Sequence, residues 1–134
     1  MSSFMNDGIQ IIPVKGMPEV APHDDLSEMI AASIELMNGD VVVVTQKIVS
    51  KAENRLVEID PEIGHKPLVE KESVSILRRR GDLIISETEH GFICANAGID
   101  LSNVESGQAA LLPKFPDKSA KKIHDSLFHK HGVE

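Results

Sequence analysis

The stretch DDLSEMIAASIELMNGDVVVV, residues 24–44, predicts a helix followed directly by a strand, and this combination decides the fold class. Apolar side chains recur at helical spacing in its first part, at Leu26, Met29, Ile30, Ile34 and Met37. Asp25 and Glu28 form the sequence pattern of a capping box, and Asn38-Gly39 supplies the stop. Four valines follow at residues 41–44, apolar on both faces, which predicts a short central strand of a sheet.

Further elements extend outward from this stretch. Strands are predicted at residues 9–14, 55–59, 82–87 and 90–96, with a tight turn at residues 88–90 joining the last two. A helix is predicted over residues 68–80, with inward positions Leu68, Val69, Ser73, Ile76 and Leu77. A second amphipathic helix begins at Asp117 as its cap, with Ala120, Ile123 and Leu127 facing inward. The mixture predicts one domain, residues 1–134, of the α+β (mixed α/β) class, with flanking amphipathic helices on a small sheet.

Composition and charge narrow the classes of function. The 134 residues are 41% hydrophobic and 26% charged, an ordinary globular balance. The net charge of −7 argues against a nucleic-acid partner, because such proteins usually carry a basic face. No apolar run approaches the ~18 residues of a membrane span, so no membrane partner is expected. A single cysteine, Cys94, excludes an intrachain disulfide and favours a reducing, cytoplasmic location.

The segment TQKIVSKAE, residues 45–53, offers a first candidate site. Ligands of open sheets gather beyond the carboxyl ends of strands, and this segment directly follows the predicted valine strand. Lys47 and Lys51 lie four residues apart beside Gln46 and Ser50, which suits them to bind phosphate oxygens. The alternative is a solvated turn with two ordinary lysines, and the segment lacks the glycines of a Walker A loop.

The segment NAGIDLSN, residues 96–103, offers a second candidate site. Asp100 is an oxygen ligand of the kind that Mg²⁺ or Mn²⁺ takes, and Asn96 and Asn103 are potential hydrogen-bonding partners of a nucleotide. The alternative is a turn rich in Asn and Asp, with Asp100 only capping the backbone. A third segment, KGMPEV at residues 15–20, is either a plain turn or a source of exposed backbone groups.

Together these stretches resemble one family. KGMPEV, GDVVVVTQKIVSKAE and ETEHGFICANAGIDLSNV, with the LLP and PDKSA segments after them, resemble the coenzyme F420-0:gamma-glutamyl ligases in the same order. The resemblance implies a GTP-dependent enzyme that uses Mn²⁺ or Mg²⁺, with K⁺ as a further candidate cation, to join L-glutamate to the deazaflavin coenzyme precursor through an acyl phosphate. It also implies a homodimer of mixed α/β fold.

The resemblance further assigns roles to residues of this sequence. A GTP site would be lined by residues 17–20, with Gln46, Lys47 and Lys51 near the phosphates and Asn103 as a further contact. The first of these ranges comprises Met17, Pro18, Glu19 and Val20. Asp100 would bind the divalent metal, and no catalytic residue is assigned.

Two departures from the family pattern limit the expected function. Family members are longer, and a further strand with an Asp-Thr pair, which supplies more metal ligands, does not occur here; the segment between RLVEI and KESVSIL is also shorter. We therefore expect catalysis to need a complementing C-terminal half. The alternatives are one subunit of a split ligase, a non-catalytic nucleotide- or metal-binding module, and an unrelated α+β domain.

Overall fold

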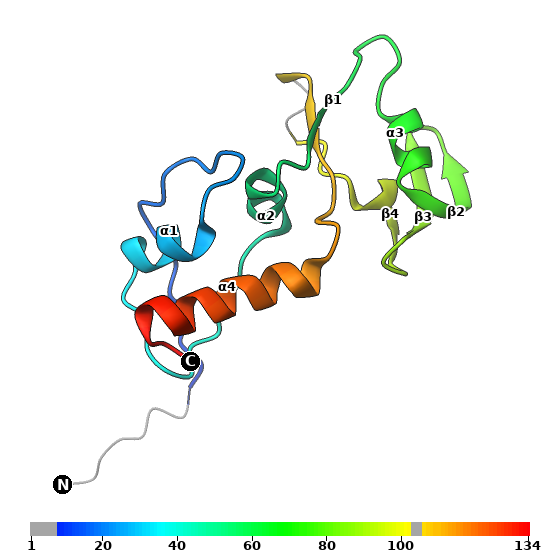
Figure 1. Cartoon of the computed structure of the whole chain (residues 1–134). Helices are drawn as coiled ribbons and strands as arrows, with labels where there is room; N and C mark the ends of the chain where they lie inside the picture. Colours follow the sequence, from blue (N-terminus) through cyan, green and yellow to red (C-terminus); the bar gives the residue numbers. More distant parts are fainter. Residues whose placement is uncertain (1–7, 103–105) are drawn as a thin grey trace, which may run out of the picture.

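A computed structural model describes residues 8–102 and 106–134 and is built from short elements (Figure 1). The helices are α1 (Leu26–Ser33), α2 (Gln46–Ala52), α3 (Lys66–Lys71), the 3-10 turn η1 (Asn96–Gly98) and α4 (Pro116–His131). The strands are β1 (Leu56–Glu58), β2 (Ser73–Arg80), β3 (Leu83–Thr88), β4 (Ile93–Ala95) and β5 (Gln108–Ala110). The predicted α+β class is confirmed.

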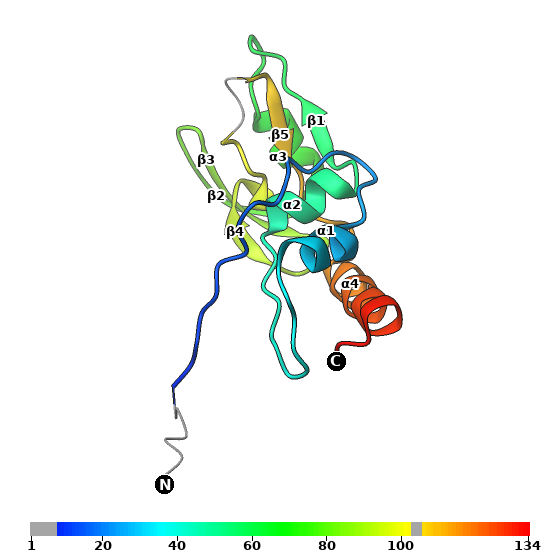
Figure 2. The ribbon, with the colours of Figure 1, turned by 90° about the vertical axis from the view of Figure 1, so that its left-hand side faces the viewer.

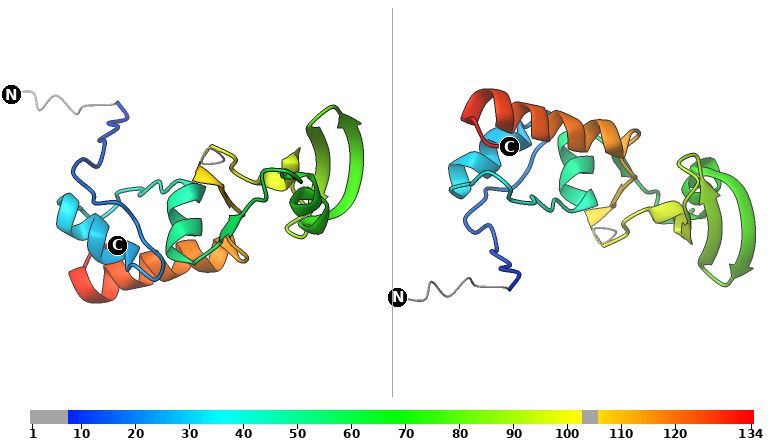
Figure 3. Two further views of the ribbon diagram at one scale, coloured as in Figure 1. Left: turned by 90° about the horizontal axis from the view of Figure 1, so that it is seen from above. Right: turned by 90° about the horizontal axis from the view of Figure 1, so that it is seen from below.

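The elements gather in two lobes joined by a narrow ribbon. One lobe holds α1, α2 and α4, and the other holds α3 with β2, β3 and β4, while β1 and β5 lie between them (Figures 1 and 3). In the view turned by 90°, the first lobe faces the viewer and residues 8–14, in dark blue, extend away from the helices (Figure 2). The candidate segments are thus arranged around the ribbon rather than within one large sheet.

Both sheets are small and antiparallel. The ribbon pairs β1 with β5 and sets Val57 opposite Ala109. The second sheet has the order β2-β3-β4, with Ser86 opposite both Ile76 and Cys94. The predicted strand pair at residues 82–96 is therefore confirmed, with its turn held by bonds from Thr88 N to Phe92 O and from Gly91 N to Thr88 O, each of 2.9 Å.

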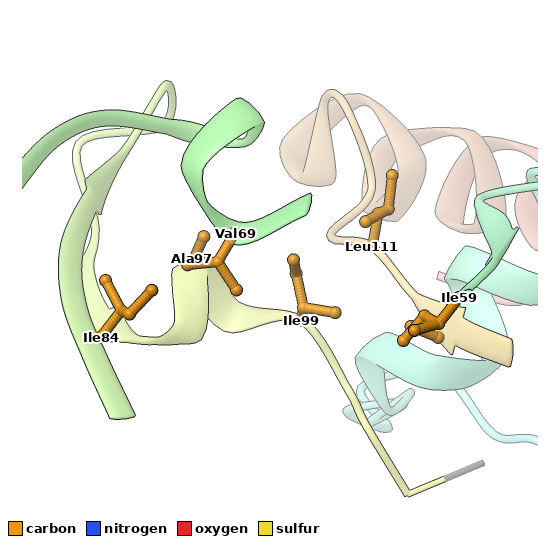
Figure 4. Packing of buried hydrophobic residues seen from close by; sticks show 7 residues of the cluster. Ile59, Val69, Ile84, Ala97, Ile99 and Leu111 are labelled. Atoms are coloured by element: carbon orange, nitrogen blue, oxygen red, sulfur yellow. The ribbon is translucent and has the colours of Figure 1, made fainter. Parts of the chain in front are cut away.

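Each lobe has its own buried cluster. The sheet lobe and ribbon share one cluster, in which Val69 of α3, Ala97 of η1 and Ile84 of β3 pack together (Figure 4). The helical lobe buries a second, smaller one, formed by Val20, Leu26, Ile30 and Val49. Ile123 packs against it and Leu127 of α4 is buried, as predicted, whereas Ala120 is exposed and its predicted inward position is wrong.

The predicted helix start at Asp25 is confirmed, but the helix is shorter than expected. The Asp25 carboxylate accepts hydrogen bonds from the N–H groups of Ser27 (3.0 Å) and Glu28 (3.3 Å). Ser33 is the last helical residue, because Ile34 adopts an extended conformation. Met37 starts a turn in which its N–H donates to Asp40 Oδ2 at 2.9 Å, and its side chain is 65% exposed rather than inward.

Two predicted strands are absent. Residues 9–14 and 41–44, the second of which we call the valine segment, have no strand assignment among the described residues. Ile9 and Ile11 are 97% and 89% exposed, and Val41 and Val43 are 86% and 87% exposed. The interpretation of the valine segment as a central strand, apolar on both faces, is therefore wrong. β-Branched residues favour a strand, but a strand also needs a neighbour for its backbone.

The predicted helix over residues 68–80 is only partly present. Helix α3 ends at Lys71, and strand β2 takes over from Ser73 to Arg80. Val69 is buried and Leu68 packs against the same cluster, but Ile76 and Leu77 are exposed, so their predicted inward positions are wrong. Pairing with β3 determines the outcome, because it satisfies the backbone groups of a segment whose side-chain pattern fits either structure.

The second amphipathic helix is confirmed with a different start. Phe115 is the N-cap residue and Pro116 is the first helical residue, so Asp117 lies in the first turn and is not the cap. Gly132 ends the helix in the left-handed conformation, φ 68°. Within the described part of the chain, no helix is long and apolar enough to cross a membrane.

Asp25 also connects α1 to α4, and this predicts a pH-dependent stability. Lys130 Nζ lies 2.8 Å from Asp25 Oδ2, and this bond, followed by the one from Ser27, lowers the pKa of Asp25. We expect Asp25→Ala to cost about 1 kcal/mol of unfolding free energy at pH 7, because the helix loses its N-cap. Asp25→Asn should cost less, since asparagine caps well and loses only the charge.

The pH dependence separates the two contributions. A carboxyl whose pKa is lowered by folding stabilises the protein above its unfolded pKa, and this contribution is lost as pH falls through the folded value. The difference between wild type and Asp25→Asn in urea titrations followed by circular dichroism should therefore shrink below about pH 4. A pH-independent difference would show that the Lys130 pair contributes nothing.

Candidate functional site

Helix α2, which the sequence did not predict as a helix, positions both candidate lysines. Its inner face buries Val49 and Ser50, and Ser50 Oγ donates to the carbonyl oxygen of Leu111 at 2.5 Å. Gln46 Nε2 donates to the same oxygen at 3.0 Å. With the inner face so fixed, Lys47 and Lys51 stand one helical turn apart, as neighbours on the helix surface. Gln46 is therefore a structural anchor in this state of the chain.

Asp100 lies opposite Lys47. It forms an isolated antiparallel bridge with Ala110, with N···O distances of 2.9 and 3.0 Å. Its Oδ2 lies 3.5 Å from Lys47 Nζ, and Lys47 Nζ also donates to Ser102 Oγ at 2.6 Å. The structure thus brings the TQKIVSKAE and NAGIDLSN segments into contact.

Asp100 also forms the turn that was the alternative interpretation. Its Oδ1 accepts the N–H of Ser102, two residues along, at 2.8 Å. The pKa of Asp100 is lowered, first by the side chain of Ser102, then by this N–H and by Lys47. The carboxylate is therefore anionic at neutral pH and attractive to a cation, while it also holds the turn. Ser102 is one of the oxygen-bearing side chains after the predicted strand at residues 90–96, but no role was predicted for it.

The KGMPEV segment reaches α2 through Glu19. The carboxylate of Glu19 accepts a hydrogen bond from Lys51 Nζ, which lowers the pKa of Glu19. Met17 packs against the cluster of the helical lobe and Val20 is buried in it, whereas Pro18 and Glu19 are exposed. The side chain of Val20 therefore faces the core, and only the backbone at that position can face a ligand.

The small residues at 96–98 have a structural explanation. Asn96 Oδ1 accepts the N–H of Ile84 at 2.9 Å, so this side chain connects η1 to β3. Gly98 has φ 69°, and a Cβ there would lie 2.9 Å from Leu112 Cδ1. The backbone at Gly98 therefore lies close against the side chain of Leu112. Asn103, which the family resemblance assigns to the GTP site, lies outside the described residues.

A divalent cation would find one suitable carboxylate here. Across residues 8–102 and 106–134, no three His, Cys, Asp or Glu side chains are grouped so as to hold a metal. Asp100 offers a carboxylate oxygen as one possible ligand, and Lys47 Nζ lies 3.5 Å from its Oδ2. A complete coordination sphere would need phosphate oxygens, water and carboxylates from elsewhere.

The arrangement as a whole is a helix face with two lysines, each paired with one carboxylate from a separate loop. The family model described as F420-0:Gamma-glutamyl ligase matches residues 15–134, and the chain belongs to this family. The expected family membership is therefore confirmed.

Individual proteins similar to this chain support the same family membership. A protein named Coenzyme F420:L-glutamate ligase from Methanothermobacter thermautotrophicus is 43% identical, over 95% of this chain and 59% of its own length. Proteins of the same name from Methanopyrus kandleri and Archaeoglobus fulgidus are 39% and 36% identical, over 94% and 92% of this chain. The match covers 56% of each of their lengths, so the chain spans less than three fifths of these relatives.

The Gly98 contact predicts the effect of a single methyl group. Gly98→Ala should destabilise the chain by about 2–3 kcal/mol, since it combines a left-handed backbone with a clash against Leu112. Gly91→Ala is the matched control, because Gly91 has φ 79° and open space around its Cα. It should cost only about 1 kcal/mol. Equal losses in thermal unfolding would show that Leu112 gives way freely.

Proposed function

We propose that this chain forms the nucleotide- and metal-binding part of a GTP-dependent ligase that joins L-glutamate to the deazaflavin coenzyme F420 precursor. The observation that carries the proposal is the convergence of Lys47, Lys51 and Asp100 at one place in a chain of this family. The whole reaction is proposed to need a complementing C-terminal half, because the relatives are much longer than this chain.

The lysines are proposed to hold phosphate oxygens. Each already binds a carboxylate, Lys47 that of Asp100 and Lys51 that of Glu19, so each ammonium group is aimed at an anionic oxygen. Lys51 is better placed than Lys47 to bind a phosphate oxygen, because its side chain is only 16% exposed. Charged hydrogen bonds are stronger where the local dielectric constant is low. Met17, Pro18, Glu19 and the backbone of Val20 would line the same ligand, with Gln46 and Asn103 as further contacts.

Asp100 is proposed as one ligand of Mn²⁺ or Mg²⁺; a role for K⁺ remains a prediction from the family resemblance. A cation bound at Asp100 would displace Lys47 Nζ, which lies 3.5 Å from its Oδ2. That would release Lys47 for the nucleotide phosphates. When bound, the metal supplies positive charge against the charge that develops in phosphoryl transfer.

The proposed reaction has two steps on the substrates. The carboxylate of the coenzyme precursor attacks the γ-phosphorus of GTP, and GDP leaves as an acyl phosphate forms. The amine of glutamate then attacks the acyl carbon, phosphate leaves, and loss of a proton gives the amide. This chain's residues would hold the triphosphate in line for the first step. No catalytic base is assigned.

Two organisations of the enzyme remain open as proposals. The chain acts as a homodimer, or it works with a C-terminal half that supplies further metal ligands. The coverage of 56–59% of the relatives' length favours the second. The other function proposed for the chain is a non-catalytic nucleotide- or metal-binding module.

The first test concerns nucleotide binding by the chain itself. Lys51→Ala should weaken GTP binding about tenfold or more in calorimetric titrations with Mn²⁺, since a charge-assisted contact contributes about 1.5–3 kcal/mol. Lys66→Ala is the control, because Lys66 forms a comparable ion pair with Asp82 in the other lobe. Unchanged affinity in Lys51→Ala would remove this lysine from the site.

The second test concerns the reaction. The 134-residue chain incubated with GTP, Mn²⁺, L-glutamate and the precursor should give no glutamylated product detectable by mass spectrometry. Product should appear when the C-terminal region of a family ligase is co-expressed with it. Robust product from the chain alone would show that the catalytic set is complete within it. GTP binding without product in either arrangement would favour the non-catalytic module.

A further inference from the structure

The valine segment, residues 41–44, has the form of a strand without a neighbour. Its side chains alternate, with Val41 and Val43 86% and 87% exposed and Val42 and Val44 packed against the core of the helical lobe. This period of two is the geometry of an extended strand on the surface of a core. The sequence and the local packing of the valine segment therefore both favour an extended strand.

The backbone of this segment is available for pairing. Within the described residues, no backbone hydrogen bond joins the valine segment to another part of the chain. Exposed strand edges of this kind are where another polypeptide adds a strand. Two exposed valines beside such an edge add apolar surface that an added strand would cover.

An apolar groove runs alongside the segment. It has a volume of about 730 Å³ and is bounded by the valine segment, by α4 and by the loops at residues 90–92 and 112–113. The apolar residues that line it include Leu36, Phe92, Leu112, Ile123 and Leu127. Phe92 lines the groove and is 52% exposed, so much of its large apolar side chain is open to solvent. The groove and the free edge form one continuous surface.

The comparison with the relatives indicates what covers this surface. The chain matches 56–59% of their length, so more than two fifths of each relative lies outside the match. A part of that size is large enough to supply both a strand and an apolar face. The net charge of −7 on each chain opposes a second copy as the occupant, since like charges repel.

We propose that the valine segment and the adjoining groove are the docking surface for the C-terminal region of a family ligase, which adds a strand along residues 41–44. This inference rests on the proposed function, because it identifies where the complementing half binds. The side chains of the added strand enter the groove between the valine segment and α4. Docking there brings the C-terminal region next to Gln46, which lines the groove and begins α2.

The test is assembly in trans. The chain is co-expressed with the C-terminal region of the Methanothermobacter ligase, and the co-purified complex is analysed by amide exchange and by affinity titration. We expect exchange protection at alternate amides of the valine segment in the complex, because successive N–H groups of a strand point to opposite edges. Val43→Asp should raise the dissociation constant at least tenfold, since it places a charge on the covered surface.

Ile63→Asp is the matched control. Ile63 is a β-branched residue that is 64% exposed and lies in the loop before α3, so the same charge is introduced away from the groove. It should leave the affinity unchanged, and the circular dichroism spectra of both variants should match wild type. Equal weakening by both substitutions would overturn the docking surface.

The remaining outcomes separate the docking surface from the function. A complex that forms while amides 41–44 exchange freely, or no complex at all, overturns the proposed surface. Protection of these amides in the isolated chain at high concentration, through self-association or pairing with residues 9–14, also overturns it. If amides 41–44 are protected in the complex but no glutamylated product forms, the docking surface is supported and the ligase function is contradicted. If product forms while these amides exchange freely, the ligase function is supported and the docking surface is overturned.

Discussion

The carbonyl oxygen of Leu111 is the point on which the arrangement of the site depends. It accepts hydrogen bonds from Gln46 and Ser50 of α2, while the N–H of Leu111 donates to Arg55 O at 3.0 Å. One residue therefore fixes the helix to the ribbon. Ser50 is fully buried and its Oγ also accepts a hydrogen bond from Gln46 Nε2 at 2.8 Å, so breaking the bond to Leu111 would leave a buried hydroxyl donor without an acceptor. Because Asp100 pairs with the neighbouring Ala110, the same junction sets the position of Asp100 relative to Lys47.

The electrostatics of the site follow from its surroundings. The chain carries 21 acidic and 14 basic residues, so a triphosphate approaches an acidic molecule. Two lysines on one helix turn offset that repulsion locally, but each is shared with a carboxylate. Under the proposed function, a divalent cation bound at Asp100 would change this balance, because it would neutralise the carboxylate that now pairs with Lys47. Nucleotide and metal binding at this place are therefore expected to support each other.

Sequence reasoning succeeded where the local signal and the tertiary context agree. Asp25 begins α1 as its pattern predicts, and the strands on either side of the Thr88 turn pair with each other. It failed where a partner decides the structure. The residues of β2 fit a helix as well as a strand, and only β3 settles the question. Strand β5 reads QAA, without a β-branched residue, and it is a strand because β1 lies beside it.

The residues of the candidate site could be named from the sequence, but the contacts between them could not. The two lysines and Asp100 were identified from their residue types and from the family resemblance, and the structure brings Lys47 and Asp100 together. The carboxylate of Glu19 on Lys51 and the hydroxyl of Ser102 on Lys47 arise from the meeting of distant segments. No short-range pattern carries that information. Asn96 shows the converse, because a residue type suited to a nucleotide connects two backbone segments instead.

The division of the buried residues into two clusters bears on how the chain unfolds. The clusters sit in different lobes, and the ribbon between them has three residue pairs. A cooperative transition requires that loss of one region destabilise the other, and here few contacts transmit that loss. The helical lobe, with four buried apolar residues in its cluster, is expected to melt before the sheet lobe. Calorimetry would then give a measured enthalpy larger than the van't Hoff enthalpy, as for two weakly coupled units.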